Sequence, residues 1–262
     1  MKTTKEHRGV HKLVRKAYGE VAAKSISCCS GSSCGCGPKP AASEGELGLS
    51  CGNPVAFSKI KKGMTVLDLG SGAGKDVFIA APLAGPKGKV IGVDMTSEML
   101  KLAAKNLVKF TARTGLTNVE FRKGLIEKLP VKDGEADLVI SNCVVNLSPD
   151  KPAVFREAFR ALKPGGFMVV SDIVLNRELP PALKKHAGLY AACVAGALLR
   201  RDYLGAIKDA GFTGLKLLAD SAYRAGGTCS DPITDKAGKA LDGAASSITV
   251  FAGKYKKTKG AR

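Results

Sequence analysis

Residues 64–76 read Met64-Thr-Val-Leu-Asp68-Leu-Gly70-Ser71-Gly72-Ala73-Gly74-Lys75-Asp76, and the expected architecture follows from them. An apolar run is followed by three glycines at alternate positions, and a helical pattern begins at Asp76. This order predicts a buried strand that turns sharply into a helix. Glycine suits such a turn because backbone with a positive φ, or backbone pressed against a ligand, leaves no room for a Cβ atom. We therefore expect a ligand to lie over this turn.

The glycine spacing differs from that of a dinucleotide-binding turn. The dinucleotide fingerprint has its third glycine about five residues after the first, whereas here the three glycines alternate. A second apolar run, over 89–93, ends in Asp94, and a carboxylate there suits the two hydroxyls of a ribose. With Asp68 placed two residues before the first glycine, the arrangement resembles motif I and the acidic loop of class I S-adenosylmethionine (SAM) methyltransferases.

Charge and length limit the class of protein. The chain has 262 residues, enough for one large α/β domain or one domain with a smaller appendage. Its formal charge is +18, of which residues 1–24 and 254–262 supply +10. Basic ends of this kind are typical of solvated extensions, so we expect no specific nucleic-acid partner. The absence of a long apolar run and of a signal-peptide core predicts a cytoplasmic protein without a membrane partner, which we expect to be a monomer.

The eight cysteines are expected to be thiols available for metal or redox chemistry. Cys28, Cys29, Cys34 and Cys36 lie in a Ser/Gly/Pro-rich segment, 25–46, which lacks periodicity and is expected to be a loop. A zinc site is one interpretation, but an adjacent pair and a C-x-C pair fit tetrahedral zinc spacing poorly. We favour exchangeable thiols on a flexible arm.

Cys51 directly precedes a predicted helix start. Asn53 can cap a helix whose first position is Pro54. The positive end of the helix dipole would favour the thiolate form of Cys51, although a small buried residue in a turn explains the position equally well.

Residues 5–24 carry apolar side chains on one stripe, which predicts an amphipathic helix packed on the body or over the cleft. His7 and His11 lie one turn apart on this helix and could bind a metal, although such a face is more often simply solvated. We expect His186 to be a surface or packing residue rather than a general base.

The middle of the chain predicts an α/β fold with a Rossmann-like, mostly parallel, doubly wound sheet. Strands over 119–123, 136–141 and 167–175 alternate with helices over 97–114 and 151–162. Ligands of such sheets bind beyond the carboxyl ends of the strands, so turns that follow different strands should meet at one edge.

Two of these turns carry candidate site residues. After the third strand, Ile126 and Glu127 are placed to contact an adenine ring and its edge. After the fourth strand come Asn142 and Cys143, where methyltransferases of exocyclic amines commonly have Asn/Asp-Pro-Pro-Tyr and pyrimidine C5 enzymes have Pro-Cys. Because neither motif is present, nucleobase methylation loses most of its support.

The last third of the chain is expected to form a smaller α+β appendage. Helices over 180–199 and 200–210 precede strands over 215–218 and 247–252. Cys193 lies in the first of these helices, where a core cysteine is the ordinary interpretation. The expected domains are an N-terminal helix and cysteine-rich loop at 1–46, a SAM-binding domain at 47–175, and a C-terminal cover region with a basic tail at 176–262.

Taken together, the motifs resemble those of arsenite methyltransferases. The resemblance runs from about Val14 to about Phe212. Its motifs are the Cys28-Cys29 loop, the Asp68–Asp76 turn, Cys51-Gly-Asn-Pro54, Gly124-x-Ile126-Glu127-x-Leu129-Pro130, Ser141-Asn142-Cys143-Val144-x-Asn146-Leu147 and Cys193-Val-Ala-Gly-Ala197.

The resemblance implies methyl transfer from SAM to As(III), without a metal cofactor. It implies that Cys51, Cys143 and Cys193 bind As(III), with arsenite and methylated trivalent arsenicals as substrates. Cys28 or Cys29 would then form a disulfide with Cys51, which an external reductant such as thioredoxin or glutathione would reduce. The residues assigned to SAM are Asp68, Gly70, Ser71, Gly72, Asp94, Met95, Ile126, Glu127 and Asn142.

The chain departs from the family pattern at several positions. Leu49 stands where the family often has a tyrosine, and Cys34, Cys36 and Cys229 have no clear counterpart. With leucine at position 49, a SAM contact made by that tyrosine in the family has no counterpart here.

The chemistry of arsenic fits this set of residues. As(III) is soft and three-coordinate, so three thiolates are natural ligands and leave its lone pair free. No proton leaves arsenic, so no general base is required. Holding nucleophile and methyl group at about 3–3.5 Å can contribute roughly 7–11 kcal/mol.

Three alternatives remain open from the sequence. A SAM methyltransferase of another small molecule, such as a quinone precursor, leaves the cysteines unexplained. A non-catalytic arsenic- or metal-sequestering protein leaves the glycine turn unexplained. An RNA methyltransferase fits the charge and predicts strongly salt-dependent binding to RNA.

Overall fold

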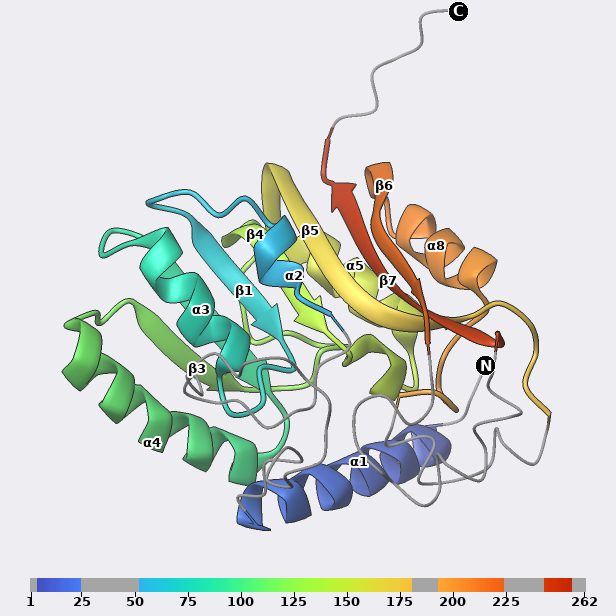
Figure 1. The fold of residues 1–262 in the computed structure, drawn as a ribbon, viewed down its shortest axis with the longest axis horizontal. Helices are drawn as coiled ribbons and strands as arrows, with labels where there is room; N and C mark the ends of the chain where they lie inside the picture. The colour runs from blue at the N-terminus through green and yellow to red at the C-terminus, as the bar shows by residue number, and fades with distance from the viewer. Residues whose placement is uncertain (1–3, 25–51, 181–192, 224–242, 256–262) are drawn as a thin grey trace, which may run out of the picture.

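The computed structural model describes residues 4–24, 52–180, 193–223 and 243–255, whose arrangement is shown in Figure 1. Several residues with predictions lie outside these ranges: Cys28, Cys29, Cys34, Cys36, Leu49, Cys51, His186 and Cys229.

Within the described ranges, seven strands form one sheet in the order β3-β2-β1-β4-β5-β7-β6. The first five strands run parallel, and β7 pairs antiparallel with both β5 and β6. The predicted doubly wound sheet is therefore confirmed, and the chain after residue 175 completes the same sheet. The strands are β1 (Thr65–Leu69), β2 (Lys89–Asp94), β3 (Val119–Lys123), β4 (Ala136–Asn142), β5 (Leu162–Leu175), β6 (Thr213–Ala222) and β7 (Ala245–Gly253).

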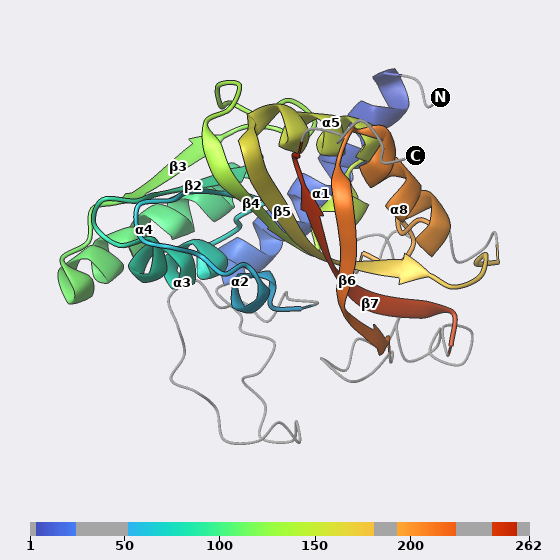
Figure 2. The ribbon, with the colours of Figure 1, turned by 90° about the horizontal axis from the view of Figure 1, so that it is seen from above.

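Helices cover both faces of the sheet (Figures 1 and 2). One face packs against α2, α3 and α4, and the other against α5 and α8. The predicted N-terminal helix is present as α1, which packs against α4. The bounds are α1 (Thr4–Lys24), α2 (Pro54–Phe57), α3 (Lys75–Ala84), α4 (Ser97–Thr114), α5 (Lys151–Ala161) and α8 (Arg200–Asp209), with a short 3-10 helix η1 (Val145–Leu147).

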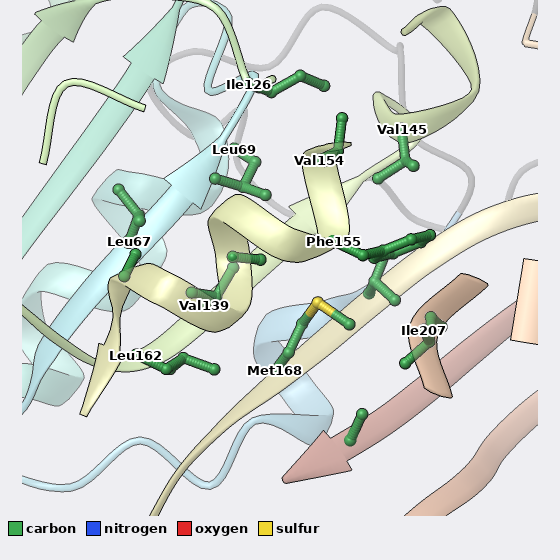
Figure 3. Packing of buried hydrophobic residues seen from close by; sticks show 14 of the residues in the cluster. Leu67, Leu69, Ile126, Val139, Val145, Val154, Phe155, Leu162, Met168 and Ile207 are labelled. Carbon is green, nitrogen blue, oxygen red and sulfur yellow. The ribbon is translucent and has the colours of Figure 1, made fainter. Parts of the chain in front are cut away.

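Alternation along the strands divides the core into two layers. In β1, Val66 faces the layer of α3 and α4, whereas its neighbour Leu67 faces the layer of α5. Figure 3 shows the second layer, where Phe155 of α5 and Ile207 of α8 pack over the sheet. Burying each side chain of this size contributes about 1.5–3 kcal/mol, so the sheet edge that carries the turns is firmly positioned.

The prediction of a helix over 180–199 is wrong at residues 193–199, which the structure describes. Residues 193–199 form turns and a bridge, and Cys193 has φ +64°. A helix cannot include a residue with that backbone angle. Instead, Leu175 N–H donates to Leu198 C=O at 2.8 Å, and a parallel bridge joins Leu175 to Leu199. These contacts hold residues 198 and 199 against the end of β5.

The fifth strand also begins earlier than expected, at Leu162 rather than at residue 167. The Pro-Gly-Gly turn stays paired with the chain that follows β7: Gly165 N–H donates to Lys254 C=O at 2.9 Å, and Lys254 N–H donates to Gly166 C=O at 2.8 Å. In the described part of the chain, no helix is long and apolar enough to cross a bilayer.

Candidate active site

A cavity lies beyond the carboxyl ends of the parallel strands, with a volume of about 980 Å³ including its open mouth. Its walls come from α1, from the turns after β1, β2, β3 and β4, and from η1. Every residue that the sequence assigned to SAM lines this one cavity, together with Cys143: Asp68, Gly70, Ser71, Gly72, Asp94, Met95, Ile126, Glu127 and Asn142.

The glycine turn after β1 forms the floor of the cavity. Gly70 and Gly72 have φ of +66° and +52°. A Cβ atom on Gly70 would come within 2.8 Å of Val144 Cβ, so the turn packs directly on the residue after Cys143. A Cβ on Gly72 would have only Met99 Sδ near it, at 4.0 Å. The backbone at Gly72 is therefore open to the cavity, as a close ligand requires.

Ser71 supplies an unused polar group in this turn. Its hydroxyl is buried and has no hydrogen-bond partner in the structure. A Cβ atom on Gly92 would lie 2.8 Å from this oxygen, so the hydroxyl packs against β2. Ser71 lines the cavity as a residue of the glycine turn.

Asp94 holds the glycine turn with both carboxylate oxygens. Oδ2 accepts from Gly72 N–H at 3.0 Å and Oδ1 from Thr96 N–H at 2.7 Å. Burial raises the pKa of Asp94, and these backbone donors oppose that rise. Each oxygen keeps accepting capacity, so Asp94 can still receive the two hydroxyls of a ribose.

Negative charge is concentrated at the cavity floor. Burial, followed by the charges of Asp76 and Asp94, raises the pKa of Asp68 well above its ordinary value. A cationic ligand would relieve this repulsion by favouring the ionised form of Asp68. The sulfonium and ammonium groups of SAM are cations of this kind, so the floor fits SAM electrostatically.

Asn142 joins the cavity floor to the segment that follows Cys51. Its Nδ2 donates to Asp76 Oδ2 at 2.9 Å and to Gly52 C=O at 3.1 Å. Gly52 also approaches β5 closely, because a Cβ on it would lie 2.8 Å from Ser171 Oγ. Cys51 itself lies outside the described residues.

The two described cysteines meet beside the cavity. Cys193 Sγ donates to Cys143 C=O at 2.8 Å, and both residues are buried, 3% and 5% exposed. Cys143 N–H donates to Ser171 C=O, which ties its turn to β5. Cys143 is disulfide-bonded, so the expectation of a thiol is wrong at this position, whereas Cys193 is a free thiol. Burial, followed by the charge of Asp172, raises the pKa of the Cys193 thiol.

Both cysteines have left-handed backbone. Three non-glycine residues have positive φ in the described part of the chain, and two of them are Cys143 (φ +58°) and Cys193 (φ +64°). Strained backbone of this kind clusters at functional sites. The sequence motifs identified both cysteines as candidate site residues. Their positive φ angles could not be predicted from the sequence.

The helix α1 contributes residues that the sequence patterns did not assign to the site. His11 Nε2 lies 3.0 Å from Glu127 Oε1, which also accepts from the Ser148 hydroxyl. The interpretation of His11 as a solvated or metal-binding residue is therefore not supported, since its side chain is only 16% exposed and pairs with a carboxylate. No group of three metal-binding side chains occurs within the described ranges.

Tyr18 is the second contribution of α1. Its ring packs against the buried cluster that contains Cys143 and Cys193, and burial raises the pKa of Tyr18 well above its ordinary value. The spacing of His11, Val14 and Tyr18 by three and four residues places all three on one helix face, toward the cavity. The sequence predicted the buried face of α1, but not the contacts of these side chains.

A buried polar cluster supports η1 from behind. Asp172 accepts from Asn146 Nδ2 at 2.9 Å and from the Tyr203 hydroxyl at 3.1 Å. Burial raises the pKa of Asp172 to about 7, against the opposing effects of Tyr203 and Lys151. Asn146 belongs to a quoted motif, but its partner on β5 could not be read from the sequence.

Known proteins resemble the chain in sequence. A family model described as a methyltransferase domain matches residues 60–219. An arsenite methyltransferase of Halobacterium salinarum is 48% identical over 172 residues, covering 66% of this chain and 43% of that protein. An arsenite methyltransferase of Aquipseudomonas alcaligenes is 40% identical over 222 residues, covering 80% of this chain and 64% of that protein. The chain thus spans less than two thirds of the length of these curated relatives.

A solved structure also matches the chain. The crystal structure of an arsenic(III) S-adenosylmethionine methyltransferase from Chlamydomonas reinhardtii matches with a TM-score of 0.66 and 38% identity, covering 79% of this chain and 67% of that one. Fold, cavity and sequence similarity agree. The chain belongs to the arsenite methyltransferase family of class I SAM-dependent methyltransferases.

Proposed function

We propose that this protein transfers the methyl group of SAM to thiol-bound As(III). The observation that carries the proposal is the pair Cys143 and Cys193, adjacent beside the cavity and both in left-handed backbone. That conformation costs about 1–3 kcal/mol at a residue other than glycine, so an ordinary turn would favour glycine or asparagine. Keeping cysteine at both positions supports a role for sulfur.

The third proposed arsenic ligand is Cys51. Its neighbour Gly52 accepts a hydrogen bond from Asn142, the residue before Cys143, and packs against Ser171, which also pairs with Cys143. Gly52 is the residue that follows Cys51, and its contacts with the turn of Cys143 support the proposal. We propose that the C-terminal region, 176–262, binds arsenic through Cys193 and that its segment 193–199 covers the site, while β6 and β7 of the same region complete the sheet.

The chain's own residues would bind and orient both substrates. We propose that Asp94 receives the ribose hydroxyls, that Ile126 and Glu127 contact the adenine, and that Asp68 faces the cationic end of SAM. When bound, SAM supplies an electrophilic methyl group for the arsenic lone pair. The apolar wall of α1 limits the access of water, and no general base is needed because no proton leaves arsenic.

Arsenic binding needs no separate proton acceptor either. In the exchange of As–OH for As–S, the thiol proton goes to the departing hydroxide and forms water, so the charge of the site does not change. This matters for Cys193, whose pKa is raised by burial and which therefore enters the exchange as a thiol.

We propose that an external thiol reductant, such as thioredoxin or glutathione, prepares the site. Cys143 is disulfide-bonded in the structure and in that form has no thiolate for arsenic. Two external thiol groups would reduce this bond, giving two protein thiols and one external disulfide. Methyl transfer through its lone pair raises arsenic from the trivalent to the pentavalent state. We also propose that Cys28 or Cys29 then forms a disulfide with Cys51, with the two electrons of the thiols returning arsenic to the trivalent state and their two protons leaving in water with an arsenic oxygen. Methylated trivalent arsenicals are the further substrates that we propose.

The proposed setting is a cytoplasmic monomer without a nucleic-acid or membrane partner. The amino-acid composition supports the absence of a nucleic-acid partner, because much of the positive charge belongs to the two ends of the chain. Salt-dependent RNA binding would contradict this part of the proposal.

The test is methylation by purified protein supplied with labelled SAM, arsenite and a thiol reductant. We expect Cys51→Ser, Cys143→Ser and Cys193→Ser each to abolish transfer to arsenic while SAM binding persists. Cys229→Ser, at a cysteine without a family counterpart, is the matched control and should retain activity.

The alternatives give different results in the same assay. Normal turnover of Cys143→Ser or Cys193→Ser would refute the three-thiol site. Transfer to a quinone precursor but not to arsenic would favour another small-molecule methyltransferase. Arsenic binding without SAM binding would favour a sequestering protein.

A further inference from the structure

We propose that Ser148 is a positioning residue that fixes the carboxylate of Glu127, so that Oε2 of this carboxylate receives the exocyclic amine of adenine. The inference rests on the proposed function, because it takes the cavity as the SAM site and Glu127 as the adenine contact. It adds the residue that orients Glu127 and the oxygen that faces the base.

Glu127 uses one of its two carboxylate oxygens for contacts within the protein. Oε1 accepts from the Ser148 hydroxyl and lies 3.0 Å from His11 Nε2. A carboxylate has no proton to give, so His11 donates from Nε2. Neither contact uses Oε2. Since Glu127 lines the cavity and 13% of its side-chain surface is exposed, Oε2 is the oxygen left for a ligand.

Ser148 holds its hydroxyl in a single direction. The residue is buried, and its hydroxyl oxygen accepts from Asp150 N–H at 3.1 Å. That bond occupies a lone pair of the oxygen, so the one hydroxyl proton points to Glu127. The backbone of Ser148 is also held, because its N–H donates to Val145 C=O at 3.1 Å and its C=O accepts from Lys151 Nζ at 2.9 Å. Little conformational freedom is therefore lost when this donor orients its acceptor.

The segment that carries Ser148 is anchored on the sheet. Within η1, Asn146 Nδ2 donates to Asp172 Oδ1 at 2.9 Å and to Ile173 C=O at 2.7 Å. Both acceptors belong to buried residues of β5. The position of Ser148 is therefore set by β5, and Glu127 is held relative to the sheet through this serine.

The chemistry of the base decides which ligand this arrangement accepts. The exocyclic amine of adenine is a hydrogen-bond donor, whereas a carboxylate oxygen only accepts. Deamination replaces the amine by a carbonyl, which would place one acceptor against another. A site built to hydrogen-bond an N–H group rejects the analogue that lacks it, because the polar group of the site is then left unpaired. The fixed carboxylate therefore selects adenine over a deaminated purine.

The experiment measures dissociation constants by calorimetry for S-adenosylhomocysteine and its deaminated counterpart, S-inosylhomocysteine. The original protein should bind the adenine ligand at least about tenfold more tightly. In Ser148→Ala, the adenine ligand should bind about tenfold more weakly and the preference should shrink to about threefold or less, because the carboxylate is free to turn.

Ser246→Ala is the matched control. Ser246 is also buried, and its hydroxyl oxygen accepts from Asn176 Nδ2 at 3.0 Å, but it lies outside the cavity wall. This variant should match the original protein for both ligands.

Glu127→Gln gives a sharper test. Ser148 and His11 both donate to the position of Oε1, so the glutamine amide should place its oxygen there and its NH2 group toward the base. That NH2 group opposes the amine of adenine and donates to the carbonyl of the deaminated base, so the preference should reverse. In the double variant Ser148→Ala/Glu127→Gln the reversal should weaken, because one of the two donors that orient the amide is gone.

The contrary outcomes separate the inference from the proposed function. If Ser148→Ala weakens both ligands by the same factor, Ser148 only stabilises η1 and the positioning role is wrong. If Glu127→Gln keeps the preference for adenine, Oε2 does not face the amine, and the inference is again overturned. Absence of S-adenosylhomocysteine binding by the original protein would contradict the proposed function itself, whereas tight binding of both ligands without preference would overturn only the present inference.

Discussion

Nε2 of His11 lies 3.0 Å from Oε1 of Glu127, so one hydrogen bond joins two residues that are 116 positions apart. It connects α1 to the turn after β3, and both residues line the cavity. The N-terminal helix is therefore part of the cavity wall, and its contacts should affect what the cavity binds.

Replacing His11 by leucine should weaken SAM binding about three- to tenfold, because Glu127 loses one of its two described donors and α1 loses a polar anchor. Isothermal titration calorimetry measures this change. His7→Leu, one turn earlier and outside the cavity wall, is the matched control and should leave the affinity unchanged. Equal effects of the two variants would mean that His11 acts only through the stability of the helix.

Asp68 should give SAM binding a pH dependence. The pKa of Asp68 in the free protein is raised well above its ordinary value, and a bound cation favours its ionised form. SAM affinity should therefore increase as pH rises toward this pKa, with release of a proton that calorimetry in buffers of different ionisation enthalpy detects. In Asp68→Asn, both the pH dependence and much of the affinity should disappear.

Asp68→Asn should also stabilise the folded protein relative to the original protein, and this stabilisation should increase with pH. A carboxyl group whose pKa is raised by folding destabilises the folded state as pH rises above the ordinary value, because the unfolded chain ionises first. Asparagine stays neutral. The gain in unfolding free energy of Asp68→Asn over the original protein should therefore be larger at pH 8 than at pH 5, as measured by urea denaturation. An equal gain at both values would contradict the assignment of a raised pKa.

Gly70 and Gly115 form a matched pair for testing the glycine turn. Both have positive φ, +66° and +70°, so alanine at either position carries the same backbone strain of about 1–2 kcal/mol. A Cβ on Gly70 would also strike Val144, whereas a Cβ on Gly115 meets nothing within 4 Å. Gly70→Ala should abolish SAM binding and lower stability further than Gly115→Ala, which should keep its activity. Similar losses in both variants would show that strain alone matters.

Tyr203 stabilises the buried carboxyl group behind η1. Its hydroxyl donates to Asp172 Oδ2 at 3.1 Å, while its ring packs edge-on against Phe155 with centroids 5.3 Å apart. Tyr203→Phe keeps the ring and removes the donor, which should cost about 1–3 kcal/mol of unfolding free energy. Because the pKa of Asp172 is about 7, the loss should be larger at pH 8, where the group is ionised, than at pH 6. Tyr255→Phe, at the exposed tyrosine, should show neither the loss nor its pH dependence.

Local patterns were sufficient to predict most of the sheet. The turn at 64–76 and the alternating strands and helices that follow it are determined by short-range preferences, so the sequence shows them directly. Asn53 likewise caps α2 as predicted, with its Oδ1 accepting from Ala56 N–H at 3.0 Å. Strand order at the carboxyl edge then brings the predicted SAM residues to one cavity.

The sequence was misleading where long-range pairing outweighs local preference. The apolar pattern around Cys193 favours helix, but the segment pairs with the end of β5 and turns with positive φ. The polar partners of α1 were also beyond prediction. A helical stripe shows which face is buried, but not that His11 meets Glu127 or that Tyr18 packs against the cluster containing Cys193, because those contacts depend on how α1 lies across the sheet edge.

The left-handed backbone at Cys143 and Cys193 has a consequence for protein engineering. Selection for heat resistance alone would enrich glycine or asparagine at these two positions, since both residues relax the backbone there. The gain in melting temperature would come with the loss of both sulfur atoms. A thermostable variant meant to keep the proposed arsenic chemistry should therefore keep these two codons fixed and seek its stability elsewhere in the chain.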